Sequence, residues 1–163
     1  MSLVMNPLQL IKTMSIPDIW DKLSTIPGGS RLFSEVLARY VPYSGSVKPE
    51  VLSLSKGHCE ARLKDRRIVR NHLNSIHAAA LMNFAELSSG LALHYSLPKT
   101  GRGILKRFDI SYVKKARGEL RSISNFQVPE HFEAEQDFIV LSKVFDASGD
   151  LVCEATATWK VST

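Results

Sequence analysis

The chain has 163 residues, of which 44% are hydrophobic and 23% are charged. This size and composition predict one globular domain and exclude a disordered or low-complexity chain. Two cysteines, Cys59 and Cys153, are too few for a disulfide scaffold, so we expect a cytoplasmic protein. We find no secretion signal and no apolar run that could span a membrane, so we expect no membrane partner.

The net charge of +5 is distributed unevenly along the chain. Residues 99–121 hold eight basic against two acidic residues, and residues 56–70 hold six against two. Residues 130–163 hold seven acidic against two basic residues. Two basic stretches on either side of an apolar segment fit an anionic partner, although a solvated surface explains them equally well. No nucleic-acid-binding motif accompanies the charge, so we expect a phosphorylated small ligand rather than nucleic acid.

The first 42 residues are predicted to form a helical extension of the domain. Apolar spacing favours a helix over residues 7–23, which Pro17 must interrupt or restart. After a break at residues 26–29, Ser30 is the expected N-cap of a second helix that ends at Tyr40, before Pro42. We therefore divide the single domain into an extension, residues 1–42, and a core, residues 43–163.

Alternating apolar residues predict a strand at the start of the core. Leu52 and Leu54 stand at even-numbered positions, whereas Cys59 and Leu63 stand at odd-numbered positions. The parity changes across Gly57, which predicts one long strand with a bulge at that glycine. A polar, basic loop follows at residues 64–75.

Residues 76–97 are predicted to form one long buried helix. This segment is apolar or small almost all round and carries a single formal charge, Glu86. A helix of this kind lies in the middle of a protein, covered on several sides. Pro98 ends it.

The remainder of the chain reads as three or four antiparallel strands. The clearest alternation runs over residues 151–161, and residues 147–150 form a strong hairpin signal. A sheet of this length must twist, and wrapping it around the apolar helix would bury both. We therefore predict an α+β domain with an antiparallel sheet around one central helix.

Glu86 is the first candidate for a chemical role. Asn83, Ser89 and Gly90 lie three or four residues away and share its helix face. A carboxylate in such surroundings acquires a raised pKa, as a general base or nucleophile requires. The alternative is a buried glutamate that hydrogen-bonds to the backbone or ties two subunits together.

His77 marks the second candidate feature, the start of the long helix. Backbone N–H groups there lack partners within the helix and suit a polarised carbonyl or an oxyanion. Ala78 and Ala79 would let a ligand approach the backbone closely. Nine residues separate His77 from Glu86, so the two point to opposite helix faces. If both are catalytic, two helices must meet in a two-fold dimer with shared sites.

The pattern Asn71, then His77-Ala78-Ala79, then Glu86 resembles the Asn…His-Gly-Gly…Asp pattern of hotdog-fold acyl-CoA thioesterases of the phenylacetate-degradation type. The resemblance covers residues 51–161 and implies the hotdog fold. It implies that Glu86 activates water or attacks directly. It also implies that the Ala78 N–H polarises the thioester carbonyl and that Asn71 holds the water.

The sequence departs from the family pattern at three places. Two alanines replace the glycines, which adds methyl groups beside the N–H groups, and Glu86 replaces the commoner Asp. Lys114 stands where some relatives carry a small hydroxyl, two residues after the position of Tyr112. The combination of alanines and glutamate is closer to a thioesterase-like branch of the superfamily. The resemblance to that branch implies no particular substrate.

The resemblance also implies the partners of this chain. The substrate is an acyl-CoA or an acyl-carrier thioester, and CoA belongs to that substrate, so we expect no cofactor. The expected assembly is a homodimer or a dimer of dimers. Basic side chains would hold the CoA phosphates, and five further residues are candidates for substrate binding. These residues are Lys114, Lys115, Arg117 and Arg70, together with Ala79, Asn83, Ser89, Gly90 and Tyr112.

Other functions are less consistent with the sequence. The histidines lack the spacing of a metal site, so we expect no metal. The lack of a nucleophile elbow or a phosphate-binding glycine loop excludes serine hydrolases and nucleoside-triphosphate enzymes. A non-catalytic acyl-CoA or lipid-binding hotdog module is the main alternative. A hotdog dehydratase or hydratase ranks last, because its acid and histidine have a different spacing.

Overall fold

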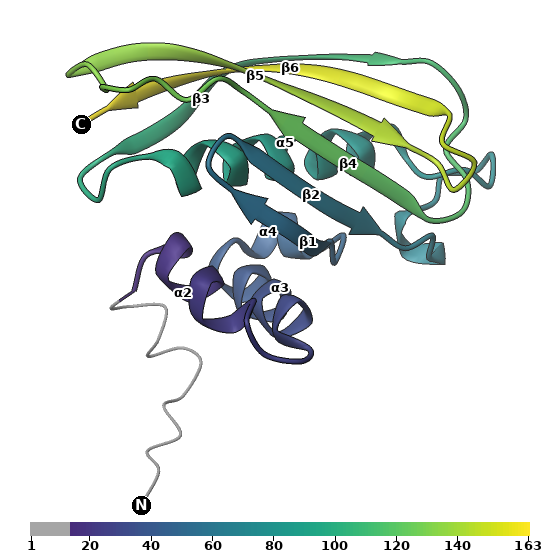
Figure 1. The fold of residues 1–163 in the computed structure, drawn as a ribbon. Coiled ribbons are helices and arrows are strands. Elements are labelled where there is room, and N and C mark those ends of the chain that lie inside the picture. Colours follow the sequence, from purple (N-terminus) through teal and green to yellow (C-terminus); the bar gives the residue numbers. More distant parts are fainter. Residues whose placement is uncertain (1–13) are drawn as a thin grey trace, which may run out of the picture.

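A six-stranded antiparallel sheet wraps around one long helix, α5, in this computed structural model, which describes residues 14–163 (Figure 1). The strand order is β1-β2-β4-β5-β6-β3. The α+β hotdog fold expected from the sequence is thereby confirmed. The elements are α2 (Ile16–Leu23), α3 (Gly29–Tyr40), α4 (Pro42–Gly45), β1 (Glu50–Ser55), β2 (His58–Leu63), the 3-10 turn η1 (Arg67–Val69), α5 (Ala78–Ser96), β3 (Arg102–Tyr112), β4 (Leu120–Asn125), β5 (Glu135–Phe145) and β6 (Leu151–Ser162).

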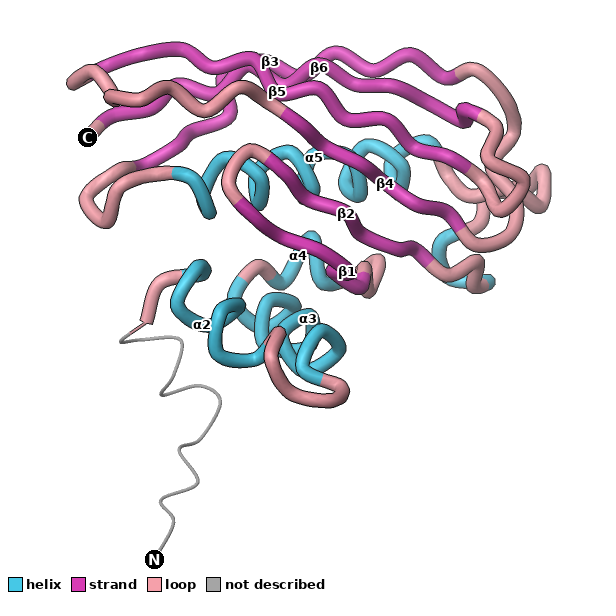
Figure 2. Tube along the Cα trace, viewed as in Figure 1, coloured by secondary structure: helices cyan, strands magenta, loops and turns pink. Residues whose placement is uncertain are grey.

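Helix α5 lies where its composition predicts, with its ends two residues and one residue inside the expected range. Phe84, Ala85 and Ser88 are fully buried, and the long strands β3, β5 and β6 pass over this helix (Figure 2). One stretch near its start escapes coverage, because Ala78, Ala79 and Met82 are exposed. The helix is therefore buried on most sides and uncovered along one stripe of its first turns.

The prediction of one long strand bulged at Gly57 is wrong. The segment forms a hairpin in which β1 pairs antiparallel with β2, and Ser55 lies opposite His58. Gly57 occupies the turn with a φ of +73°, a conformation that suits glycine. The parity changes there because the chain reverses direction. A register shift does occur, but between Val51 and Ser53.

The helices before the sheet begin differently from the prediction. The start of the expected first helix lies outside the described residues. Pro17 falls in the first turn of α2, whose N-cap is Ser15, so a helix begins at this proline. Ser30 is not the N-cap of α3, since Gly28 takes that position. The Ser30 hydroxyl instead donates to the Val51 carbonyl.

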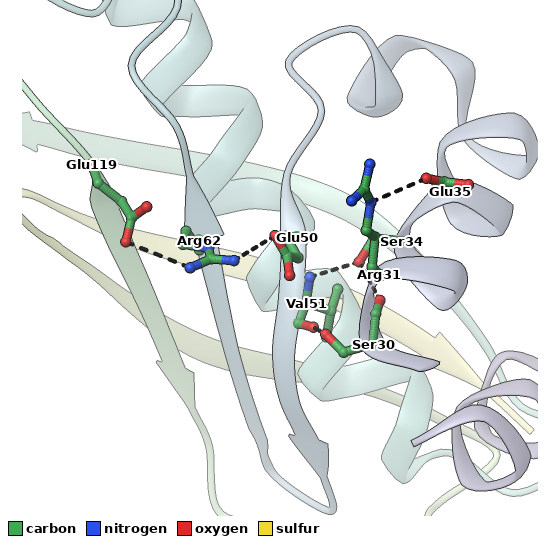
Figure 3. A network of polar contacts seen from close by, with 8 residues as sticks. All are labelled: Ser30, Arg31, Ser34, Glu35, Glu50, Val51, Arg62 and Glu119. Atoms are coloured by element: carbon green, nitrogen blue, oxygen red, sulfur yellow. Dashed lines mark hydrogen bonds and ion pairs between the residues drawn. The ribbon is translucent and has the colours of Figure 1, made fainter. Parts of the chain in front are cut away.

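Helix α3 is tied directly to the edge strand β1. The Val51 N–H donates to the Ser34 hydroxyl over 2.8 Å, while the Val51 carbonyl accepts from Ser30 (Figure 3). Phe33 and Trp20 meet edge to face and belong to the same apolar cluster as α5 and β6. The helices thus share a core with the sheet, and the boundary at residue 42 stays a prediction.

The interior contains a polar cluster between α5 and the sheet. Ser88 lies 2.6 Å from Ser122 and 2.9 Å from Ser124, hydroxyl to hydroxyl, and Ser142 lies 2.6 Å from Ser124. All four are at most 1% exposed. Such small side chains allow the helix to approach the sheet while each buried hydroxyl keeps a partner. Cys59 and Cys153 are also buried, and both are free thiols.

Candidate active site

The start of α5 presents a backbone donor without a partner. His77 is the N-cap, and its Nδ1 accepts a hydrogen bond from the Ala79 N–H over 3.0 Å. An accepting Nδ1 carries no proton, so the neutral imidazole holds its proton on Nε2. Across residues 14–163, the Ala78 N–H has no acceptor. The positive end of the helix therefore offers the Ala78 N–H to a ligand.

Asn71 shapes the loop that leads into α5. Its Oδ1 accepts from the Leu73 N–H over 2.9 Å and from the Ser75 N–H over 3.3 Å. The Ser75 hydroxyl adds a third donor at 3.2 Å. These bonds occupy the carbonyl end of the side chain, so only the Nδ2 group of Asn71 is available to hold a water.

The end of β3 lies beside the start of α5. The Tyr112 hydroxyl donates to the Ala78 carbonyl over 3.1 Å, and the Ile76 N–H donates to the Ala116 carbonyl over 2.8 Å. The structure thus brings Tyr112 and the segment after it to the helix start that carries His77. Tyr112 and Ala78 are 34 residues apart in sequence, so tertiary packing brings them together.

The four predicted phosphate ligands differ in how far their charges are already satisfied. Lys114 Nζ contacts Asp146 at 2.6 Å and Asp150 at 2.7 Å. Arg70 pairs with Asp65 at 2.6 Å. Lys115 and Arg117 are exposed and, in the described part of the chain, have no carboxylate within 4 Å. Lys115 and Arg117 therefore have the charge most available to an anionic ligand.

A cavity of about 250 Å³ adjoins the helix start. Its wall comes from α4, η1 and the first two turns of α5: Tyr43, Ser46, Val47, Ile68, Val69, Arg70, His77, Ala79, Ala80 and Asn83. The Asn83 Nδ2 donates to the Tyr43 carbonyl over 3.1 Å, and its buried Oδ1 has no donor among the described residues. The α4 and η1 residues were not predicted from the sequence, because no motif marks these short turns.

Glu86 lies further along α5, half-buried and without a partner. No hydrogen bond or ion pair to its carboxylate occurs within residues 14–163. Burial raises the pKa of this carboxyl above its ordinary value. The predicted raised pKa thus has desolvation as its cause, with no charged neighbour involved.

Ser89 and Gly90 lie beside Glu86, as their spacing predicts, and Trp159 of β6 packs against both. The Ser89 hydroxyl donates to the Glu86 carbonyl over 2.8 Å and accepts from Trp159 Nε1 over 3.3 Å. A methyl group on Gly90 would come within 3.2 Å of the indole and 4.0 Å of Glu86 Oε1. Trp159 was not predicted to contact Ser89 and Gly90. The alternation of residues in the last strand does place its side chain on the inward face.

Within one chain, the helix start and Glu86 do not meet. Nine residues at 1.5 Å each separate His77 from Glu86 by about 13 Å along the axis. The uncovered stripe of α5, formed by Ala78, Ala79, Met82 and Glu86, connects them on the surface. One protomer alone thus cannot place the Ala78 N–H and the Glu86 carboxylate on the same small group.

Within residues 14–163, no group of three or more His, Cys, Asp and Glu side chains could hold a metal ion. Over the same residues, no helix is both long and apolar enough to cross a membrane.

Sequence comparison assigns the chain to a family. Residues 29–161 match the family described as a domain of unknown function, DUF4442. The chain belongs to this family. The match includes α3 and the whole sheet, so it covers both the start of α5 and Glu86. No curated protein is significantly similar to the chain.

Solved structures share the fold. A structural-genomics protein is 26% identical with a TM-score of 0.78, over 90% of this chain and 97% of its own. A Pseudomonas aeruginosa protein of unknown function, described as a probable thioesterase, is 21% identical with a TM-score of 0.70, over 84% and 96%. A Haemophilus influenzae thioesterase is 13% identical with a TM-score of 0.67, over 78% and 88%. The resemblance to hotdog thioesterases is confirmed at the level of the fold.

Proposed function

We propose that this protein hydrolyses a thioester, an acyl-CoA or an acyl-carrier thioester, to the free acid and the thiol. The observation that carries the proposal is Glu86, a half-buried carboxylate without a partner, on the uncovered stripe of α5. The same stripe begins at the unpaired Ala78 N–H. Similar folds described as thioesterases, from Pseudomonas aeruginosa and Haemophilus influenzae, support this reaction class.

The proposed reaction uses three chemical groups. The Ala78 N–H donates to the thioester carbonyl oxygen and stabilises the oxyanion that forms there. Glu86 takes a proton from a water that the Asn71 Nδ2 group helps to hold, and this water attacks the carbonyl carbon. The tetrahedral intermediate then expels the thiolate, which receives the proton from Glu86. A raised pKa suits the glutamate to both proton transfers.

The proposed site lies between two copies of the chain. Each copy would contribute its helix start to one site and its Glu86 to the other, because the two are about 13 Å apart on one helix. The uncovered stripe of α5, with Met82 at 42% exposure, provides an apolar surface for this contact. The proposed assembly is therefore a homodimer or a dimer of such dimers.

The phosphate end of the substrate would lie near the end of β3. Lys115 and Arg117 carry the unpaired charge there, whereas Lys114 and Arg70 would share their charge with aspartates. The acyl group would enter along Ala79, Asn83 and the neighbouring cavity. The methyl groups of Ala78 and Ala79 narrow this approach and favour a slender acyl group.

A second candidate is a non-catalytic acyl-CoA or lipid-binding module. The observation that favours it is the His77 cap, which already occupies the Ala79 N–H and leaves only one donor for the carbonyl oxygen. Lys114, where relatives carry a hydroxyl, is held by two aspartates. This candidate predicts that an acyl-CoA raises the melting temperature without being hydrolysed.

Thiol release from short-, medium-, long-chain and aromatic acyl-CoAs tests the proposal. The wild type is compared with Glu86→Gln, which removes the base but keeps the shape of the side chain. Glu154→Gln, on an exposed position of β6, is the matched control. We expect Glu86→Gln to lose at least about 100-fold in kcat while the control keeps its rate. Equal rates in all three proteins would refute the assignment of Glu86.

A further inference from the structure

A basic groove of about 830 Å³ lies between α3, the segment after α4, and the β1–β2 hairpin. Its volume is within the range of about 300–1,000 Å³ typical of small-molecule sites. Six cationic side chains line it: Arg31, Arg39, Lys48, Arg62, Lys64 and Arg66. The groove shares no lining residue with the cavity at the start of α5.

The two carboxylates of the groove neutralise only part of this charge. Arg31 pairs with Glu35 at 3.5 Å, and Arg62 pairs with Glu50 at 2.7 Å and, outside the lining, with Glu119 at 3.8 Å (Figure 3). Six basic against two acidic residues leave a formal charge of +4. The remaining four cations, Arg39, Lys48, Lys64 and Arg66, have no carboxylate within 4 Å across residues 14–163.

No undescribed part of the chain can supply the missing negative charge from its side chains. Residues 1–13 contain no aspartate and no glutamate. Like charges gathered in a concave surface raise the local potential and attract an anion from solution. The groove thus fits an anionic ligand from outside the chain better than an internal ion pair.

Several of the cationic groups are held in place by the fold. Arg66 Nη2 donates to the Val47 carbonyl, and Arg39 Nη1 donates to the Glu35 carbonyl over 3.0 Å. Lys48 has a positive φ of 49°, and its N–H donates to the Gly45 carbonyl. This turn fixes the backbone direction between α4 and β1. The Arg62 Nε–H is buried with no acceptor among the described residues. The charges are therefore partly pre-arranged, which lowers the entropic cost of binding.

We propose that this groove binds the phosphate groups of a nucleotide-type small molecule. A guanidinium group can donate two parallel hydrogen bonds to the oxygens of one phosphate, and lysine supplies a compact positive charge. Phosphate sites therefore commonly contain both arginine and lysine. The cations converge from several elements on one hollow, which suits a compact polyanion rather than an extended nucleic acid. The ligand is either a free nucleotide or the nucleotide end of a CoA-type carrier, which would then lie in this groove instead of beside Lys115 and Arg117.

Calorimetric titration with adenosine 3′,5′-bisphosphate and with ADP tests the groove. The variant Lys48→Asn/Lys64→Gln removes two unpaired charges, and asparagine tolerates the positive φ at position 48. The control Lys56→Gln/Lys99→Gln removes the same charge from exposed lysines that do not line the groove. We expect affinity to fall about tenfold in the groove variant and to stay unchanged in the control.

Three outcomes would overturn the proposal. These are the lack of binding by either nucleotide at millimolar concentration, equal weakening in both double variants, and binding of an oligonucleotide alone. Kinetics then separate the two sources of phosphate, and either result agrees with a phosphate site. A raised KM for acyl-CoA with unchanged kcat in the groove variant identifies the carrier, and an unchanged KM identifies a free nucleotide. The titration needs no turnover, so it stands even if the proposed thioester hydrolysis fails.

Discussion

Glu86 shows how the position of one residue changes its pKa. The glutamate is in an otherwise apolar helix, and only solvent at the uncovered stripe hydrates its carboxylate. Burial without a cationic partner disfavours the charged form and raises its pKa. The same position therefore costs folding free energy at neutral pH and prepares the side chain to accept a proton.

This cost gives a pH dependence of stability with a definite sign. The folded state holds the Glu86 proton more tightly than the unfolded chain, so stability falls as pH rises from 4.5 through the folded pKa. Glu86→Gln removes this loss, so we expect the variant to gain stability over the wild type at pH 7 and much less at pH 4. Urea unfolding at both pH values measures the difference. A stability difference independent of pH would contradict this account.

His77 and Asn71 show how far residue patterns predict geometry. Their spacing placed both at the entry to the long helix, and the structure has them there. The pattern did not reveal that His77 caps Ala79 or that Asn71 Oδ1 closes the loop. Such bonds depend on the path of the loop, which side-chain spacing does not determine.

At the scale of elements, the β1–β2 hairpin is the clearest difference between prediction and structure, because the sequence pattern did not show that the chain reverses direction at Gly57. A bulge and a tight turn both change the parity of apolar residues across a glycine. Lys56-Gly57 is a two-residue turn, because Ser55 and His58 pair directly. The Gly57 N–H also donates to the Ser96 hydroxyl over 2.8 Å, which anchors the turn to the end of α5.

This turn should tolerate no side chain at Gly57. A Cβ there would lie 2.6 Å from the Phe126 carbonyl oxygen, and its φ of +73° is already unfavourable for alanine. Gly118 has a φ of +74° with open space around the Cβ position, so Gly118→Ala is the matched control. We expect Gly57→Ala to lower the melting temperature clearly more than Gly118→Ala does. The control should lose about 1 kcal/mol of folding free energy, the cost of a positive φ alone. Equal shifts in the two melting curves would show that the clash is relieved.

Helix α5 shows what a composition pattern predicts well. A segment that is apolar all round must be covered, and the sheet covers it on most sides. Four buried serines join the helix to the sheet through hydrogen bonds. The sequence pattern predicts the existence and length of the helix, but which of its faces stays uncovered depends on where the sheet and the N-terminal helices pack.

At the scale of the whole molecule, the uncovered stripe decides whether the proposed site can be complete. Two functional groups that are about 13 Å apart on one helix can serve one substrate only if a second copy provides the other half. We therefore expect the protein to be an oligomer, with activity that requires the assembly.

Charge placed on the stripe should separate the copies. Met82→Glu introduces a carboxylate near the twofold contact, so we expect monomers and at least about a hundredfold loss of thiol release. Ile139→Glu places the same charge on an exposed position of β5, 62% accessible and outside the stripe, and should leave the dimer intact. Light scattering coupled to gel filtration measures the oligomeric state of both variants, and the thiol-release assay measures their activity. Dimeric Met82→Glu with full activity would show that the stripe is not the contact.

The sequence by itself determined the long buried helix, the antiparallel strands after it and the spacing of Asn71, His77 and Glu86. These features follow from local periodicity, which a single chain segment carries. Only the tertiary structure decided the hairpin at Gly57, the cavity beside α4 and the basic groove against α3. The cavity and the groove join segments that are distant in sequence, so they depend on the packing of the whole chain rather than on the pattern within any one segment. The hairpin is local, but only the pairing of β1 with β2 distinguishes a tight turn from a bulge at Gly57.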